Sequence, residues 1–127
     1  MRRSMKIAFC CHLCAVVFLI AFGFTYLLRP EFMPYHADAV SRSWAEVDAS
    51  FRILILALMR VVGGGFLATA CAAGFILFTA FRKGARWAAW AIPIAGLCAS
   101  LPALYATLSV ARNTPASPPW IAAAVGT

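Results

Sequence analysis

The sequence predicts an all-α fold: a transmembrane helical bundle with up-and-down topology, three full spans and a truncated fourth. Hydrophobic residues make up 64% of the 127 residues and charged residues only 12%, against about 25% in a typical soluble domain. The uncharged runs 7–28, 61–81 and 87–111 each reach the roughly 20 residues that cross a hydrocarbon core of about 30 Å. Because that core offers the backbone no water, these runs must satisfy their hydrogen bonds internally as helices.

The first span is predicted at 7–28, after a short basic N-terminus. Its apolar run is longer than the roughly 7–15 residues of a signal-peptide core, and no Ala-x-Ala cleavage site follows it. We therefore expect a helix that is retained. Bulky side chains such as Phe18, Phe22 and Phe24 lead us to expect that this helix faces lipid more than the other two.

The polar residues 29–50, called the outer segment below, hold all four acidic residues: Glu31, Asp38, Glu46 and Asp48. Pro30 and Pro34 interrupt helical hydrogen bonding, so the early part should be irregular. Ser43 followed by Glu46 matches the capping-box pattern, and Asp48 is suited to cap the next helix. The aromatic residues of the segment suit the headgroup level of a membrane, so we expect it to lie on the bundle rather than hang free.

The second span is predicted at 51–81 and contains one charged residue in its apolar part, Arg60. As a helix it would be about 46 Å long, which exceeds the hydrocarbon core. We therefore expect it either to tilt or to project its first turns into the interface.

The third span is predicted at 85–111, after a basic turn. Trp87 and Trp90 would anchor its start at an interface, and Pro93 and Pro102 would kink it, because each removes a backbone donor. After a proline-rich connection we predict a partial helix at 119–127, too short to span and interpreted as the start of a fourth span.

The distribution of Lys and Arg predicts the orientation. The N-terminus and the turn after the second span carry more cations than the opposite side, which holds Arg29, Arg42, Arg52 and Arg112. The positive-inside rule therefore favours a multi-pass membrane protein with its N-terminus inside, that is cytoplasmic, and with the acidic segment outside. We expect the membrane to be a bacterial inner membrane, which the resemblance described below implies.

Small residues at every fourth position predict where helices pack, because helices in lipid associate through close contact. The second span has such a row at Gly64, Ala68 and Ala72, and the third has one at Ala91, Ala95, Ala99 and Ala103. We expect these two rows to form the tightest contact within the chain. The alternative is a seam between two copies.

A polar cluster around Arg60 is the predicted candidate site, since a charged residue inside a span usually has a partner. Counting helical rise places Arg60, Tyr26 and Tyr105 at one level, with Glu31 and Asp38 just above. In the structural interpretation the cluster would fix the register of the bundle, or Arg60 would snorkel outward to the headgroups. In the functional interpretation the cluster would bind an anion, a lipid headgroup or a proton.

Other chemistry finds little support in the sequence. The net charge of +7 comes without a basic stripe interleaved with aromatics, so we expect a lipid bilayer as partner and no nucleic acid. The five cysteines all lie in apolar runs and are interpreted as small buried residues. We expect no catalytic residue, metal or cofactor, and no enzymatic activity.

Three stretches resemble an uncharacterised family of small bacterial integral membrane proteins: PEFMPYHADAV (30–40), LILALMRVVGGG (54–65) and PALYATL (102–108). The resemblance implies a four-span fold, from which the end of this chain departs, and implies no activity. We expect a structural or accessory membrane protein that acts through helix contacts with another membrane protein or with itself. The alternative is a transporter or channel subunit, or a protein that binds an anion or lipid headgroup through Arg60 and the acidic segment.

Overall fold

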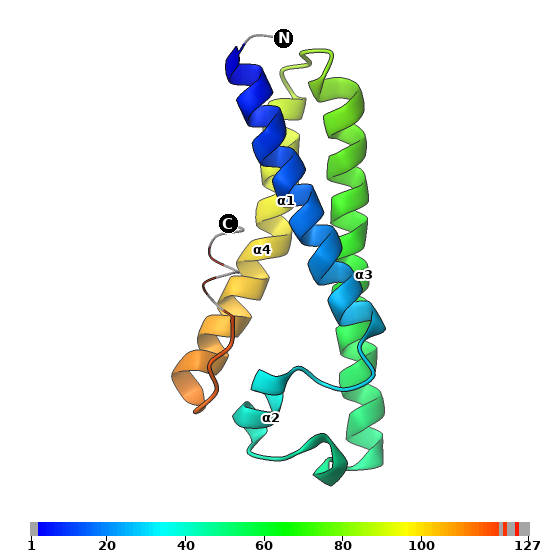
Figure 1. The fold of residues 1–127 in the computed structure, drawn as a ribbon, viewed down its shortest axis with the longest axis vertical. Helices are drawn as coiled ribbons and strands as arrows, with labels where there is room; N and C mark the ends of the chain where they lie inside the picture. Colours follow the sequence, from blue (N-terminus) through cyan, green and yellow to red (C-terminus); the bar gives the residue numbers. More distant parts are fainter. Residues whose placement is uncertain (1–2, 120, 122–123, 125–127) are drawn as a thin grey trace.

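The structure, a computed structural model, describes residues 3–119, 121 and 124, in which every regular element is a helix. Three long helices run up and down along one axis, and the short elements between residues 29 and 48 lie at the end away from the N-terminus (Figure 1). In chain order the elements are α1 (Arg3–Leu28), α2 (Pro34–Val40), the 3₁₀ turn η1 (Trp44–Glu46), α3 (Ala49–Ile76), the π-helical turn η2 (Leu77–Phe81) and α4 (Ala88–Asn113). The predicted all-α class is confirmed for these residues.

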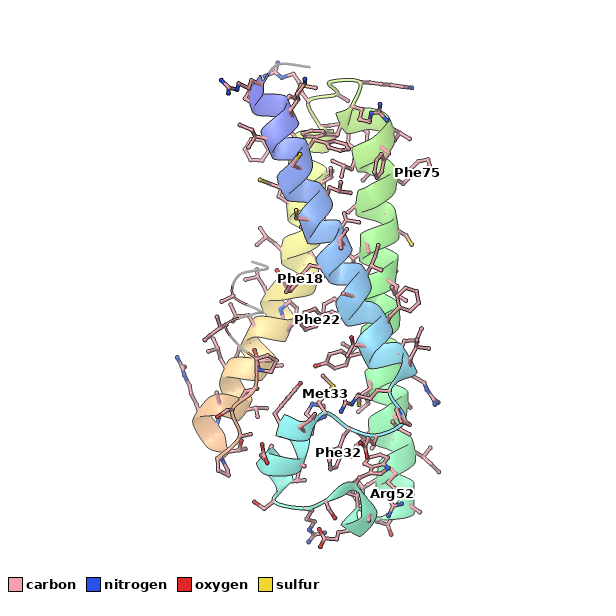
Figure 2. The ribbon with its side chains drawn as sticks, in the orientation of Figure 1. Phe18, Phe22, Phe32, Met33, Arg52 and Phe75 are labelled. Carbon is pink, nitrogen blue, oxygen red and sulfur yellow. The ribbon has the colours of Figure 1, made fainter. Side chains whose placement is uncertain are left out.

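All three long helices, the second taken with η2 as Ala49–Phe81, are apolar enough to cross a membrane, with mean hydropathies of 2.5, 2.0 and 1.7 over an 18-residue window of each. Only 11%, 17% and 6% of those windows are buried within the chain, so most apolar side chains face outward. Val61 and Phe75, each 73% exposed, illustrate this, and Phe75 points away from the bundle in Figure 2. Apolar surface on this scale needs a nonpolar surrounding, which suggests insertion in a membrane.

The predicted boundaries differ from the observed ones by a few residues. The first helix begins at Arg3 rather than at residue 7, and the second begins at Ala49, where the Asp48 side chain caps it by accepting a 2.9 Å hydrogen bond from the Ser50 N–H. The third begins at Ala88 and continues through both prolines to Asn113. The predicted partial helix at 119–127 lies outside the described residues except for three isolated positions.

The core lies near the N-terminal end of the bundle, where all three long helices meet. Leu77 and Ala88 have no exposed surface, and Phe81 and Ile92 are buried beside them. Val16 on α1 and Ala70 and Ala73 on α3 complete this cluster. The π-helical turn η2 contributes to it, since both Leu77 and Phe81 turn inward. This end of the bundle is closed by apolar packing.

The tightest helix pair is α1 with α3, which corrects the expectation that α3 and α4 would pack most closely. A Cβ atom on Gly63 would lie 2.7 Å from both the Gly23 carbonyl oxygen and the Leu27 backbone nitrogen. A Cβ on Gly23 would in turn lie 2.7 Å from the Leu67 side chain. Gly23 and Gly63 face each other and thus let the two backbones approach closely. Helix α1, whose other side chains here are bulky, therefore packs tightly on α3 at its glycine.

Helix α4 separates from α3 toward the far end of the bundle, and α2 lies between them there (Figure 1). The last buried residue of α4 is Ser100, although the helix continues to Asn113. The far end, called the outer end below, is therefore covered by the outer segment instead of by helix-to-helix packing.

Candidate functional site

The outer segment folds over the outer end around one buried ring, that of Phe32, which is 5% exposed. The Trp44 ring meets Phe32 edge to face at 4.9 Å between centroids, and the His36 ring lies 6.3 Å away. Pro34 begins α2, where a proline costs no hydrogen bond. Figure 2 shows Phe32 and Met33 directed into the space between α2 and the long helices. The predicted surface segment is therefore an ordered apolar and aromatic cap.

Arg52 on α3 holds η1 in place. Its Nε donates to the Val47 carbonyl oxygen at 2.7 Å, and a terminal nitrogen donates to the Ala45 carbonyl oxygen at 2.6 Å. The guanidinium also lies 5.7 Å from the centre of the Trp44 ring, within the range of a cation–π contact. The predicted capping box is present as well, since Glu46 accepts from the Ser43 N–H at 2.7 Å.

The outer segment is joined to α1 by a hydrogen bond between two phenols. The hydroxyl oxygens of Tyr26 and Tyr35 lie 2.7 Å apart. Burial, together with the bond to Tyr26, raises the pKa of Tyr35 above its ordinary range, so this phenol stays protonated and can donate. The bond ties α2 to the last turn of α1.

His36 is the titratable group of this cap near neutral pH. Its Nδ1 accepts a 3.3 Å hydrogen bond from the Met33 N–H at the start of α2. Burial, and secondly the positive charge of Arg29, lower the pKa of His36 below its ordinary value. The Nε of Arg29 is itself buried without a hydrogen-bond partner among the described residues. The neutral imidazole is therefore the form that fits this site.

The predicted polar cluster around Arg60 does not form. Arg60 is exposed, and no hydrogen bond joins its side chain to any other residue in the described part of the chain. Tyr105 is 77% exposed, Glu31 and Asp38 are exposed, and Tyr26 bonds to Tyr35 instead. Asp38 lines an open surface depression with Arg42 and Glu46.

The predicted cluster is absent because of the direction in which the Arg60 side chain faces. Counting residues gives height along a helix, but not direction. Gly63 is the residue of α3 that packs against α1, and Met59, one turn before it, is also buried. On an ideal helix Arg60 is turned about 100° from Met59 and about 60° from Gly63, and its side chain is exposed. The rise from Phe81 to Arg60 is about 32 Å, close to the thickness of a hydrocarbon core. The guanidinium can therefore reach headgroups without a partner inside the bundle.

The predicted packing rows behave differently on the two helices. Gly64, Ala68 and Ala72 are exposed, and a Cβ on Gly64 would meet nothing within 4 Å. On α4, the row of Ala91, Ala95, Ala99 and Ala103 is half-buried. The exposed row of α3 is called the open face below. The one sequence feature that could have predicted the close contact between α1 and α3 is Gly23, the single glycine of α1.

All five cysteines are free and exposed on the long helices, so the expectation that they are buried was wrong. Their small side chains face outward, toward the same surroundings as the exposed leucines and valines. Among the described residues no three His, Cys, Asp or Glu side chains gather where they could hold a metal ion.

Comparisons with protein-family models, with curated proteins and with solved structures find no match to this chain.

Proposed function

We propose that the chain is a small structural or accessory protein of the bacterial inner membrane, without enzymatic activity, that acts through contacts of its helices. Its relation to small four-span bacterial membrane proteins is part of this proposal and rests on the resemblance described above. A cytoplasmic N-terminus is also proposed, because the N-terminal end of the bundle carries the larger share of Lys and Arg.

The observation that carries the proposal is the open face of α3. Gly64, Ala68 and Ala72 are small residues at every fourth position, and the chain leaves them exposed while it packs the neighbouring Gly63 against α1. Small residues allow a second helix to approach closely in lipid. The open face therefore suits a helix of another membrane protein or of a second copy.

The alternative is an anion or headgroup site, or a transporter or channel subunit, built on Arg60 and the acidic residues. It is favoured by the height of Arg60, which suits a headgroup phosphate. Its weakness is that Tyr105, Glu31 and Asp38 lie apart from the Arg60 side chain. We therefore place helix contact first.

Site-directed photocrosslinking in bacterial membranes tests the proposal. A photoreactive residue at Ala68 is expected to give a discrete protein adduct, and Gly64→Leu is expected to weaken it, whereas Gly64→Ala is expected to preserve it. The same residue at Ile94 of α4, which is 57% exposed, serves as the lipid-facing control. Adducts with lipid alone at both positions would contradict the proposal.

A further inference from the structure

Two basic segments that are far apart in the sequence lie together at the N-terminal end of the bundle (Figure 1). Arg3 and Lys6 belong to the first turns of α1, and the turn between η2 and α4 carries Arg82, Lys83 and Arg86. All five side chains are exposed. We call this set the basic end.

An aromatic plug fixes the two segments to each other. The Phe9 ring of α1 meets Phe78 edge to face at 5.5 Å and lies 6.5 Å from Phe81. The His12 ring meets Phe81 edge to face at 5.4 Å. Met5 and Ala8, on either side of Lys6, pack on the same core as Ala85. The two basic segments are therefore joined to each other by apolar packing.

The turn itself is shaped to present its cations. Gly84 has a positive φ of 79°, which glycine adopts without strain, and its N–H donates to the Phe81 carbonyl oxygen at 2.9 Å. The Ala85 N–H donates to the Ala80 carbonyl oxygen at 3.1 Å. These bonds end the helix in one step, so Arg82, Lys83 and Arg86 all belong to one tight turn.

No acidic side chain lies beside these cations in the described part of the chain. All four acidic residues of the chain belong to the outer segment, at the opposite end of the bundle (Figure 1). Beside the turn, Trp87 and Trp90 are 58% and 73% exposed, and exposed tryptophans in such a position mark the level of lipid headgroups. The basic end therefore lies at the depth of lipid phosphates.

We propose that the basic end binds the headgroups of anionic phospholipids. Positive charge from two segments converges at headgroup depth on an apolar base, which matches a phosphate that is joined to acyl chains. A free anion would be attracted by the cations but, without acyl chains, would make no contact with the apolar side chains beside them. This surface is distinct from the open face of α3, so the proposal stands independently of the proposed function.

Tryptophan quenching in reconstituted bilayers tests the proposal. A full-length variant with Trp44→Phe and Trp120→Phe leaves Trp87 and Trp90 as reporters, both beside the basic end. The bilayer is phosphatidylcholine with a small, equal fraction of either brominated phosphatidylglycerol or brominated phosphatidylcholine. The anionic lipid is expected to associate at least about fivefold more strongly, the factor that a single Lys or Arg contributes near an anionic surface.

Charge variants show whether the basic end causes the preference. Replacing Arg82, Lys83 and Arg86 together by Gln is expected to lower the preference strongly while Arg3 and Lys6 sustain the remainder, whereas Arg42→Gln at the outer end is expected to leave it unchanged. If the triple variant fails to fold, Arg3→Gln with Lys6→Gln is expected to lower the preference in part. Equal quenching by both lipids, or a preference that survives all these changes, would overturn the proposal. Complete loss of the preference for the anionic lipid when inorganic phosphate is added at constant ionic strength would also overturn the proposal, because it would indicate a site for a soluble anion.

Discussion

The two ends of the bundle are held together by different forces. At the N-terminal end, three helices meet around Leu77, Phe81 and Ala88, which are nearly or completely buried. At the outer end, α4 departs from α3 and the outer segment enters between them (Figure 1). There the contacts are hydrogen bonds and aromatic edges, such as those of Arg52 and Trp44.

The difference shows how the chain adapts to its surroundings. Where the helices converge, apolar side chains fill the space, and dispersion contacts hold them. Where they diverge, the chain is close to water, and its exposed carbonyl groups and N–H groups can be bonded by polar side chains. We therefore expect mutational effects on stability to decrease from the N-terminal end toward the outer end.

The largest effect is expected for Leu77→Ala. The side chain has no exposed surface, and removing such a leucine costs about 2–5 kcal/mol of unfolding free energy. Leu58→Ala on the same helix, where the side chain is 57% exposed, should change it by less than about 0.5 kcal/mol. Unfolding in mixed micelles of detergent and dodecyl sulfate, followed by circular dichroism, measures both. Equal losses would mean that the two leucines are not packed differently.

The next effect is expected at the glycines in the middle of α3. Gly63→Ala places a methyl group against the backbone of α1 and should cost about 1–3 kcal/mol, as overpacking does. Gly64→Ala is the matched control, because its methyl group meets nothing within 4 Å. The same unfolding titration compares the two. A Gly63→Ala protein as stable as the parent would show that the backbones do not approach as closely as described.

A smaller, local effect is expected at the outer end for Arg52→Gln. The variant loses the bonds to the Val47 and Ala45 carbonyl oxygens, which should cost about 1 kcal/mol after allowance for partial exposure. Hydrogen exchange should accelerate at the amides of 44–47 while the core around Leu77 keeps its protection. Arg42→Gln, at an exposed position, should leave both regions unchanged. Loss of protection throughout the chain would instead place Arg52 among the residues that hold the whole bundle.

The smallest effect is expected for His36 as pH changes. Burial and the charge of Arg29 lower its pKa in the folded cap, so an opened cap binds a proton more readily than the folded one. The cap should therefore be most stable above the ordinary histidine pKa of about 6.5 and should weaken as pH falls below it. Tyr35 remains neutral across this range, so it does not contribute.

Hydrogen exchange of the α2 amides at pH 5 and pH 7, corrected for the intrinsic rates, measures this dependence. His36→Gln should abolish it, and His12→Gln, which alters the other histidine at the opposite end, should leave it intact. An outer segment that gains protection on acidification would show that the sign is wrong.

Local signals in the sequence located the helices well. Ser43 with Glu46 and the cap at Asp48 were recognised because capping depends on residues only two or three positions apart. The long apolar runs likewise define helices by their own composition. The π-helical turn at Leu77–Phe81 had no such local signal, and its Leu77 and Phe81 are buried in the core at the N-terminal end.

The candidate site was harder to predict, and Arg60 shows why. Its height along α3 could be counted from the sequence, but the direction of its side chain depends on which face of α3 meets α1. The face of α3 that meets α1 is the one that carries Gly63, which packs against Gly23 of α1. Gly64 follows Gly63 directly and cannot be distinguished from it in the sequence, but Gly64 is exposed whereas Gly63 is buried against α1.

The sequence by itself thus determined that this chain forms long apolar helices, where their caps lie and at which end the cations gather. These properties depend on neighbours along the chain and on the energetic cost of placing polar groups in hydrocarbon. The tertiary structure alone decided that α1 rather than α4 packs closest to α3, that Tyr26 bonds to Tyr35, and that Phe9 of α1 packs against Phe78 and Phe81 between the two basic segments. Those outcomes depend on the rotation of each helix about its axis, which is set only when side chains on separate helices fit together.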